Sequence, residues 1–206
     1  MNVWPGAAVI RDSYARLADD YIAATKDFDR FPGLRAELLG FLRSLPPGPL
    51  LDLGCGAGRD SALALSLGRP TVLADVCLDL LAKAKKRIGA ELAVCCEATA
   101  LPFRDGTFAG VIASGVLLHL PPVHLRPALE GIHRVLLAGG QAAISMKHGG
   151  LDGWRTSADF PCPRWFSYHD PEGFADMCRE VGLKVLAVEL SRRKDWFTVI
   201  AGRPDA

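Results

Sequence analysis

Short apolar runs alternate with stretches of helical periodicity along most of the chain. Each apolar run has the length of a strand and contains few polar residues. These runs occupy residues 50–53, 71–75, 92–96, 109–114, 141–146, 183–190 and 196–201. Between them, apolar positions recur every three to four residues. This spacing predicts helices over residues 9–28, 33–44, 61–67, 78–88, 123–137 and 171–181.

The alternation of strands and helices predicts an α/β domain whose parallel sheet is covered by helices on both faces. Only a polar turn separates the last two apolar runs, so they are expected to pair as an antiparallel hairpin. We expect one domain over residues 1–206. Its parts are N-terminal helices (1–45), a core (50–147), a loop (148–170) and a C-terminal helix with the hairpin (171–206). The loop lacks periodicity, and a loop of that length is usually functional.

Composition and charge narrow the classes of partner. The chain has 24 basic and 23 acidic residues, so no nucleic-acid or membrane partner is expected. The basic residues at 83–87 are interpreted as a solvated helix face. The first residues lack a signal peptide, and no apolar span approaches the ~20 residues of a membrane helix. We expect a cytoplasmic protein.

The six cysteines predict free thiols rather than disulfides in such a protein. There is no C-x-x-C pair, so no metal site is expected. Packing of small side chains is one interpretation of these residues. A thiol cluster that handles a soft metalloid is the alternative.

A glycine-rich turn joins the first apolar run to the helix that follows it. Residues 52–60 read Asp-Leu-Gly-Cys-Gly-Ala-Gly-Arg-Asp. Glycine accepts backbone angles that a Cβ atom forbids, and it lets a ligand lie directly against the main chain. The turn would also present peptide N–H groups at a helix N-terminus to that ligand. A purely structural tight turn is the alternative interpretation.

This string resembles motif I of the class I methyltransferases that depend on S-adenosylmethionine (SAM). Its G-x-G-x-G spacing differs from the G-x-G-x-x-G of dinucleotide-binding folds. Residues 97–108 are similar to the family's D-A-x-x-L-P-F-x-D-x-x-F-D segment, with Glu97 and Ala109 in place of aspartates. Residues 114–120 resemble its fourth-strand exit. Residues 132–140 resemble its R-V-L-x-P-G-G signature, with Ala138 replacing the proline.

The resemblance covers about residues 14–147, which is most of the chain, and it implies both a fold and an activity. The fold is Rossmann-like, with a seven-stranded sheet of order 3-2-1-4-5-7-6 in which only the last inserted strand is antiparallel. The cofactor is SAM, which leaves as S-adenosylhomocysteine. The activity is methyl transfer to an oxygen or nitrogen of a small-molecule acceptor, with an anionic acceptor as one hypothesis. The oligomeric state is a monomer or a homodimer.

The resemblance also assigns cofactor contacts. An acid at the end of the second strand, Asp75, would accept hydrogen bonds from both ribose hydroxyls. A helix N-cap is the alternative role for it. Glu97 would contact the adenine amino group, and the backbone of Ala98 a ring nitrogen. The expected cofactor contacts are Tyr14, Tyr21, Asp52, Gly54, Cys55, Gly56, Gly58, Arg59, Asp75, Val76, Glu97, Ala98, Thr99, Ser114 and Gly115.

Residues 13–21 look like the family's lid helix. Tyr14 and Tyr21 could cover the methionine end of SAM, or they could belong to a core stripe. The sulfonium donor is already activated, so catalysis consists mainly of alignment and needs no protein nucleophile. A general base would help an acceptor that carries a proton. The candidate catalytic residues are His119, His148 and Tyr14, although a histidine beside leucines can also be structural.

Acceptor specificity is expected from the lid and from the loop after the fifth strand. The candidates are Lys147, Trp154, Arg155, Arg164, Trp165 and Tyr168. Aromatic side chains would form a pocket wall, and arginines favour carboxylate or phosphate groups unless they are merely solvated.

Two other functions are compatible with a glycine turn and an acid at a strand end. A nicotinamide oxidoreductase would use a six-residue glycine fingerprint, which is missing from this sequence. A non-catalytic SAM-binding or regulatory protein would keep the turn but lack an open acceptor pocket.

Overall fold

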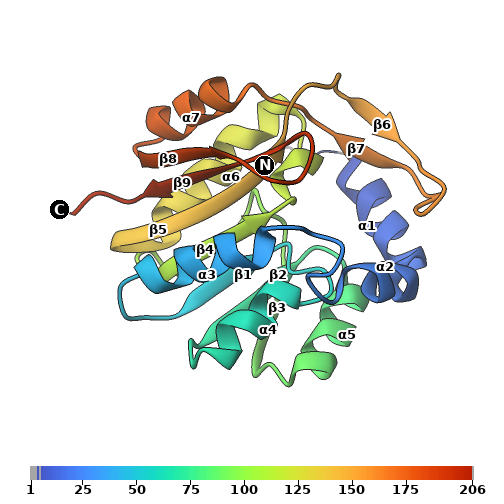
Figure 1. The fold of residues 1–206 in the computed structure, drawn as a ribbon, viewed down its shortest axis with the longest axis horizontal. Coiled ribbons are helices and arrows are strands. Elements are labelled where there is room, and N and C mark those ends of the chain that lie inside the picture. The colour runs from blue at the N-terminus through green and yellow to red at the C-terminus, as the bar shows by residue number, and fades with distance from the viewer. Residues whose placement is uncertain (1–3, 5, 206) are drawn as a thin grey trace.

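The computed structural model describes residue 4 and residues 6–205, and it has a central sheet flanked by helices (Figure 1). The helices are α1 (Gly6–Arg16), α2 (Ala18–Thr25), α3 (Leu34–Ser44), α4 (Arg59–Ser66), α5 (Leu78–Ile88), α6 (Pro122–Val135), α7 (Pro171–Glu180) and the 3-10 helix η1 (Leu117–His119). The strands are β1 (Leu50–Leu53), β2 (Thr71–Asp75), β3 (Leu92–Cys95), β4 (Phe108–Ser114), β5 (Leu136–Lys147), β6 (Gly153–Arg155), β7 (Arg164–Phe166), β8 (Lys184–Leu190) and β9 (Trp196–Gly202).

The main sheet has seven strands in the order β3-β2-β1-β4-β5-β9-β8. This confirms the predicted order 3-2-1-4-5-7-6, because β6 and β7 form a separate hairpin and shift the last two labels. The strands β1 to β5 pair in parallel, whereas β9 is antiparallel to both β5 and β8. The fold is therefore the α/β fold that the alternation predicted, and it is Rossmann-like, as the resemblance implied.

Apolar residues on both faces of the central strands explain the continuous apolar runs. In β1, Leu50 packs with Leu38 and Leu42 of α3 on one face. The next residue, Leu51, belongs to the larger core on the other face, together with Leu129 of α6. A parallel strand that is covered on both sides must be apolar at successive positions. All of β1 and β2 is buried, as this geometry requires.

The predicted helix over residues 9–28 is in fact two helices. α1 ends at Arg16 and α2 begins at Ala18, and Leu17 between them has the non-helical angles φ −103° and ψ 10°. Leu17 is buried, so the chain turns at this residue to keep a side chain in the core. The turn sets α2 at an angle to α1, and Figure 1 shows both beside the β6–β7 hairpin and α5.

The predicted loop over residues 148–170 is not irregular throughout. This segment contains the β6–β7 hairpin, in which Trp154 pairs with Trp165. The two indole rings meet edge to face with centroids 5.9 Å apart, and Trp4 stacks on Trp154 at 6.0 Å. Each strand has three residues, which is too short for a periodic pattern to be visible.

Two other boundaries differ from the prediction. α6 ends at Val135 and β5 starts at once at Leu136, so the predicted gap between helix and strand does not exist. Leu136 already pairs with Phe108 of β4, before a register shift in the ladder. Helix α7 begins as predicted, with the side chain of Asp170 accepting a bond from the amide of Gly173. Within the described residues, no helix is long and apolar enough to cross a membrane.

Candidate active site

The glycine turn after β1 adopts conformations that require glycine. Gly54, Gly56 and Gly58 have φ values of 69°, 50° and 73°, all in the left-handed region. A Cβ atom on Gly54 would lie 2.5 Å from Val116, and one on Gly56 would lie 3.0 Å from the ring of Tyr21. The alternate glycines therefore allow both the turn and the close approach of neighbouring side chains.

The amides of this turn are already engaged within the protein. The amides of Gly54 and Cys55 donate to the carbonyl of Ala74, and the amide of Gly58 donates to Cys55. The Gly56 amide donates to a carboxylate oxygen of Asp75 at 2.9 Å. The expectation that these N–H groups point at a ligand is wrong for these four residues. What the turn offers a ligand is close approach to the main chain.

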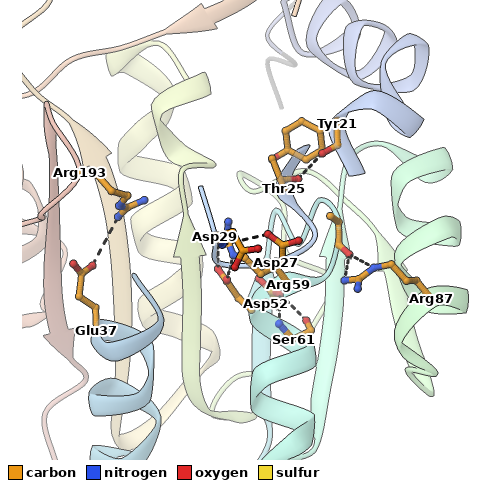
Figure 2. A network of polar contacts seen from close by, with 12 residues as sticks. Tyr21, Thr25, Asp27, Asp29, Glu37, Asp52, Arg59, Ser61, Arg87 and Arg193 are labelled. Carbon is orange, nitrogen blue, oxygen red and sulfur yellow. Dashed lines mark hydrogen bonds and ion pairs between the residues drawn. The ribbon is translucent and has the colours of Figure 1, made fainter. Parts of the chain in front are cut away.

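Asp52 lies behind the turn and holds the start of α4. Its Oδ2 accepts bonds from the amide of Ser61 at 3.1 Å and from the Ser61 hydroxyl at 2.6 Å (Figure 2). Burial, followed by the nearby charge of Asp60, raises the pKa of Asp52 to about 7. Asp52 thus positions the turn and the helix N-terminus, and it does not line the cavity described below.

Two arginines also brace this region. Arg59 pairs with Asp60 at 2.7 Å, and its guanidinium lies 4.3 Å from the ring centroid of Phe31. Arg87 was assigned to a solvated face, but its Nη2 and Nε atoms donate to the carbonyl of Ala57 at 2.6 and 3.1 Å. Arg87 is exposed, as that prediction has it, but it also supplies the donors that the carbonyl of a tight turn needs from outside the turn. Figure 2 shows Arg87 reaching the turn from α5.

Asp75 is the acid that faces the glycine turn from the end of β2. It is buried, and burial raises the pKa of its carboxyl group. One carboxylate oxygen accepts from Gly56, and the other accepts from the Cys77 amide at 2.9 Å. The N-cap of α5 is Cys77, so Asp75 does not take the alternative role of N-cap.

A cavity opens above the carboxyl ends of β1, β2 and β4. About 910 Å³ of empty space lies among its lining residues, including solvent at its open mouth. α1 and α2 cover it with Tyr14 and Tyr21, whose rings meet edge to face at 5.1 Å. Asp75 and Glu97 stand at its polar end. The Oε2 atom of Glu97 accepts a 3.4 Å bond from the Thr99 hydroxyl.

Most of the expected cofactor contacts line this cavity. The exceptions are Asp52, Cys55, Gly58 and Arg59, which lie around the turn instead. The sequence interpretation missed Trp4, Cys96 and His124, which also contribute to the wall. None of these three belongs to a motif, and only the tertiary fold brings them to the cavity.

Tyr14 and His119 form a hydrogen-bonded pair in the cavity wall. The Tyr14 hydroxyl lies 2.9 Å from Nε2 of His119, and Nδ1 lies 2.6 Å from the carbonyl oxygen of Trp165. A carbonyl can only accept, so Nδ1 carries the proton and Tyr14 donates to Nε2. Burial lowers the pKa of His119 to about 4 and raises the pKa of Tyr14. His119 therefore links α1, η1 and the β6–β7 hairpin as a neutral ring.

The cavity is not lined by His148, Arg155 or Tyr168, which are candidates for catalysis or acceptor binding. His148 does not line the cavity, and its ring lies 6.2 Å from that of Phe197. Arg155 is exposed and donates to the carbonyls of Trp154 and Leu151 in its own hairpin. The amide of Tyr168 donates to Asp152.

Lys147 and Arg164 do come together, because both lie against the ring of Phe166. The Lys147 ammonium is 5.9 Å from that ring centroid, and the Arg164 guanidinium is 5.3 Å from it. The sequence interpretation missed Arg193, which lies on Trp196 beside Lys147. A polar turn between two strands gives no sign that one of its side chains is buried.

The cysteines and the other possible metal ligands do not gather into a metal-binding cluster in the described residues. The cysteines are free thiols, as predicted. Over residue 4 and residues 6–205, no group of three or more His, Cys, Asp or Glu side chains is placed to hold a metal ion.

Comparison with known proteins shows which family this region resembles. A family model described as a methyltransferase domain matches residues 51–144, which include the glycine turn, Asp75, Glu97 and the fourth-strand exit. This central part of the chain is therefore similar to a methyltransferase domain.

The curated relatives of this chain are named for different acceptors. The probable tRNA methyltransferase 9B of Bos taurus is 38% identical over 106 residues, which are 50% of this chain and 22% of that protein. The 18S rRNA (guanine-N(7))-methyltransferase bud23 of Schizosaccharomyces pombe is 38% identical over 109 residues, or 48% of this chain and 41% of that protein. The chain thus spans less than half the length of these relatives.

Solved structures extend the likeness to the whole chain at the level of the fold. A Burkholderia thailandensis 1,6-didemethyltoxoflavin-N1-methyltransferase, solved with its substrate and S-adenosylhomocysteine, has a TM-score of 0.76 at 22% identity. It covers 100% of this chain and 92% of its own. The [4+2]-cyclase SpnF has a TM-score of 0.78 at 16% identity, with 100% and 99% coverage. The methyltransferase fold therefore supports more than one chemistry.

Proposed function

We propose that the chain binds SAM in this cavity and transfers the methyl group to an oxygen or nitrogen of a small-molecule acceptor. The observation that carries the proposal is the cavity itself. The glycine turn forms its floor, Asp75 and Glu97 provide carboxylates in its wall, and Tyr14 and Tyr21 cover it.

The donor set fits the adenosyl group of SAM. Each oxygen of Asp75 accepts one bond from the backbone. A carboxylate has about four lone-pair sites, so each oxygen retains one for a ribose hydroxyl. Glu97 and Ala98 line the same end of the cavity, where the adenine would lie. Gly54 and Gly56 allow the rest of the cofactor to approach the main chain without a clash.

SAM supplies an activated methyl group, so the protein residues have to align the acceptor and exclude water. Alignment of this kind contributes on the order of 7–11 kcal/mol to lowering the barrier. The lid residues Tyr14 and Tyr21 and the apolar wall at Ile10, Val116 and Leu120 keep water out. No protein nucleophile is part of the proposed reaction.

We assign Tyr14 and His119 a positioning role. His119 is neutral at pH 7, because its pKa is lowered to about 4, and its Nε2 lone pair is occupied by the Tyr14 hydroxyl. A group of such low basicity is a poor general base at neutral pH. The pair instead holds the lid over the cofactor. The acceptor atom should therefore already have a free lone pair when it binds, so that His119 does not have to deprotonate it.

An RNA acceptor is the second candidate, because curated relatives are named as tRNA and rRNA methyltransferases. The charge of this chain argues against it. A net charge of +1 provides little of the electrostatic attraction that dominates nucleic-acid binding. The lid also encloses the cavity, so a polynucleotide would have to flip a base into it.

The test combines a binding measurement with a transfer assay. Calorimetry should detect binding of SAM and S-adenosylhomocysteine but not of NADH. Asp75→Asn should weaken cofactor binding at least tenfold, whereas the exposed Asp79→Asn serves as a matched control without effect. Radiolabelled methyl should then transfer to members of a panel of small acids, phenols and amines, and not to bulk tRNA or rRNA. Transfer to RNA alone, or tight binding of NADH alone, would contradict the proposal.

A further inference from the structure

A cluster of four cations, Arg59, Lys147, Arg164 and Arg193, lies beside the cavity. They come from α4, the end of β5, strand β7 and the turn before β9, so the fold gathers them from distant parts of the chain. Burial and the neighbouring charges of Arg164 and Arg193 lower the pKa of Lys147, partly offset by Asp195. Like charges placed this close together repel each other unless an anion lies among them.

Arg193 has a more deeply buried side chain than Arg59. Its side chain is 9% exposed, and its Nη2 atom is buried without a hydrogen-bond partner among the described residues. Glu37 lies opposite at 3.9 Å, which is too long for a hydrogen bond (Figure 2). The guanidinium stacks 4.6 Å above the centroid of Trp196. Burial lowers the pKa of this guanidinium.

Arg164 has aromatic neighbours and no acidic partner. Its guanidinium lies 4.6 Å from the ring centroid of Phe160, 5.3 Å from that of Phe166 and 5.9 Å from that of Tyr14. Its Nε atom is buried and makes no hydrogen bond within the described part of the chain. A buried N–H of a charged group that lacks an acceptor costs a substantial free energy, which a bound anion would recover.

The local charge balance indicates which charges of the cluster are least compensated. Arg59 is paired with Asp60, Arg193 faces Glu37, and Lys147 feels the charge of Asp195. No carboxylate of the described residues lies within 4.0 Å of Arg164. Lys147 has no carboxylate within this distance either, so Arg164 and Lys147 carry the least compensated charges of the four. A carboxylate bound at Arg164 would offset part of this charge.

The cluster borders the cavity at two points. Tyr14, which lines the cavity, has Arg164 on its other side. Gly115 also lines the cavity, and a Cβ atom there would lie 3.0 Å from the ring of Trp196. The rings of Phe166 and Trp196 alternate with the charges of Arg164, Lys147 and Arg193. A planar apolar group could contact these rings while its charged group meets the arginine.

We propose that this cluster is the acceptor subsite and that it selects an aromatic monocarboxylate. The carboxylate accepts from Arg164, with Lys147 and Arg193 adding to the positive field, and the aromatic ring lies against Phe166 and Trp196. The inference rests on the proposed function, because it identifies the class of acceptor for the same cavity. It also agrees with the neutral Tyr14–His119 pair, since a carboxylate is already deprotonated at pH 7.

The test uses the full chain saturated with S-adenosylhomocysteine and two probes of the same shape, 4-fluorobenzoate and 4-fluorobenzamide. Fluorine NMR titration should give at least tenfold tighter binding of the benzoate. Raising the salt concentration should weaken that binding only. Equal affinity of the two probes would overturn the proposal, and phenyl phosphate should bind no more tightly than the benzoate.

Variants locate the site. Arg164→Gln should weaken benzoate binding at least tenfold, whereas Arg164→Lys should keep most of it, because the charge remains. The matched control is Arg126→Gln on α6, since Arg126 is exposed and paired with Glu180. Unchanged benzoate binding by Arg164→Gln would overturn the assignment. If Arg164→Gln does not fold, the comparison of the two probes in the wild-type chain still decides.

Calorimetry of S-adenosylhomocysteine tests the cofactor site separately from the acceptor subsite. Binding of the cofactor product without preference for the benzoate contradicts the subsite alone. Failure to bind the cofactor product contradicts the proposed function on which the subsite rests.

Discussion

At the scale of single residues, the Tyr14–His119 pair makes the stability of the protein depend on pH. The folded-state pKa of His119 is about 4, whereas an unfolded histidine titrates near 6.5. Between these values the unfolded chain binds a proton that the native state does not bind. Acidification from pH 6.5 to 4 should therefore remove up to about 3 kcal/mol of the free energy of unfolding.

Urea unfolding of wild type and His119→Gln at pH 5 and pH 7.5 measures this effect. The wild type should lose more stability on acidification than the variant does, since glutamine does not titrate. The change in stability between the two pH values is taken within each protein, so the contacts that the substitution removes do not affect the comparison. Parallel pH profiles would show that His119 does not lie buried and neutral.

Asp52 should have the opposite pH dependence. Its folded-state pKa is raised to about 7, above the ordinary value of 3.8, so the native state retains a proton that the unfolded chain has already lost. Raising the pH through this window therefore destabilises the fold at Asp52. Asp52→Asn keeps an acceptor for Ser61 and does not titrate. Its stability relative to wild type should rise between pH 5 and pH 8 in urea unfolding, and a constant difference would contradict the assignment.

At the scale of elements, substitutions of two glycines distinguish the cost of backbone strain from the loss of cofactor binding. Gly56→Ala places a Cβ atom against Tyr21 at a φ of 50°, in the floor of the cavity. Gly68→Ala is a matched control, because Gly68 has a φ of 73° but a Cβ atom added there would meet nothing within 4 Å. Both should lose about 1 kcal/mol of stability from the left-handed backbone. Only Gly56→Ala should also weaken S-adenosylhomocysteine binding, by at least tenfold in calorimetry. Equal binding by the two variants would count against the turn as part of the cofactor site.

Elements whose environment is uniform along their length were predictable from the sequence. β1 and β2 are covered on both faces, so every residue in them had to be compatible with burial, and the pattern was visible. The β6–β7 hairpin was not predictable, because its strands are short and aromatic contacts with Trp4 and between the two strands hold it. The break at Leu17 was also missed, since apolar spacing continues through it.

The same distinction holds for side chains at the candidate site. Asp75 was recognisable because it follows a strand at a fixed distance from the glycine turn. Arg87 and Arg193 were not recognisable, because their partners are a carbonyl of Ala57 and the ring of Trp196, and only the tertiary fold brings these together. Motifs therefore located the floor of the cavity, whereas the positions of Arg87 and Arg193 depend on packing between remote segments.

At the scale of the whole molecule, the lid is connected to the β6–β7 hairpin through a chain of contacts. The Tyr14 side chain in α1 bonds to His119 of η1, which bonds to the backbone of Trp165 in β7. The Ser13 hydroxyl of α1 donates to the carbonyl of Pro163 at 2.7 Å, and Lys83 of α5 pairs with Asp19 of α2. Helix α1, η1 and the β6–β7 hairpin are thus joined to one another around the cavity mouth, and few of these contacts lie in the core.

Because these contacts are few, ligand binding should order the lid and the hairpin together. S-adenosylhomocysteine at 100 times its dissociation constant should add about 2.7 kcal/mol to the free energy of unfolding. Hydrogen exchange should slow in residues 6–25 and 153–166 as well as in the glycine turn, since Tyr14 joins all three regions. Tyr14→Phe should bind the cofactor with protection retained at the turn but lost in the hairpin. Protection limited to the turn in the wild-type chain would mean that the lid and the hairpin open independently of the cofactor.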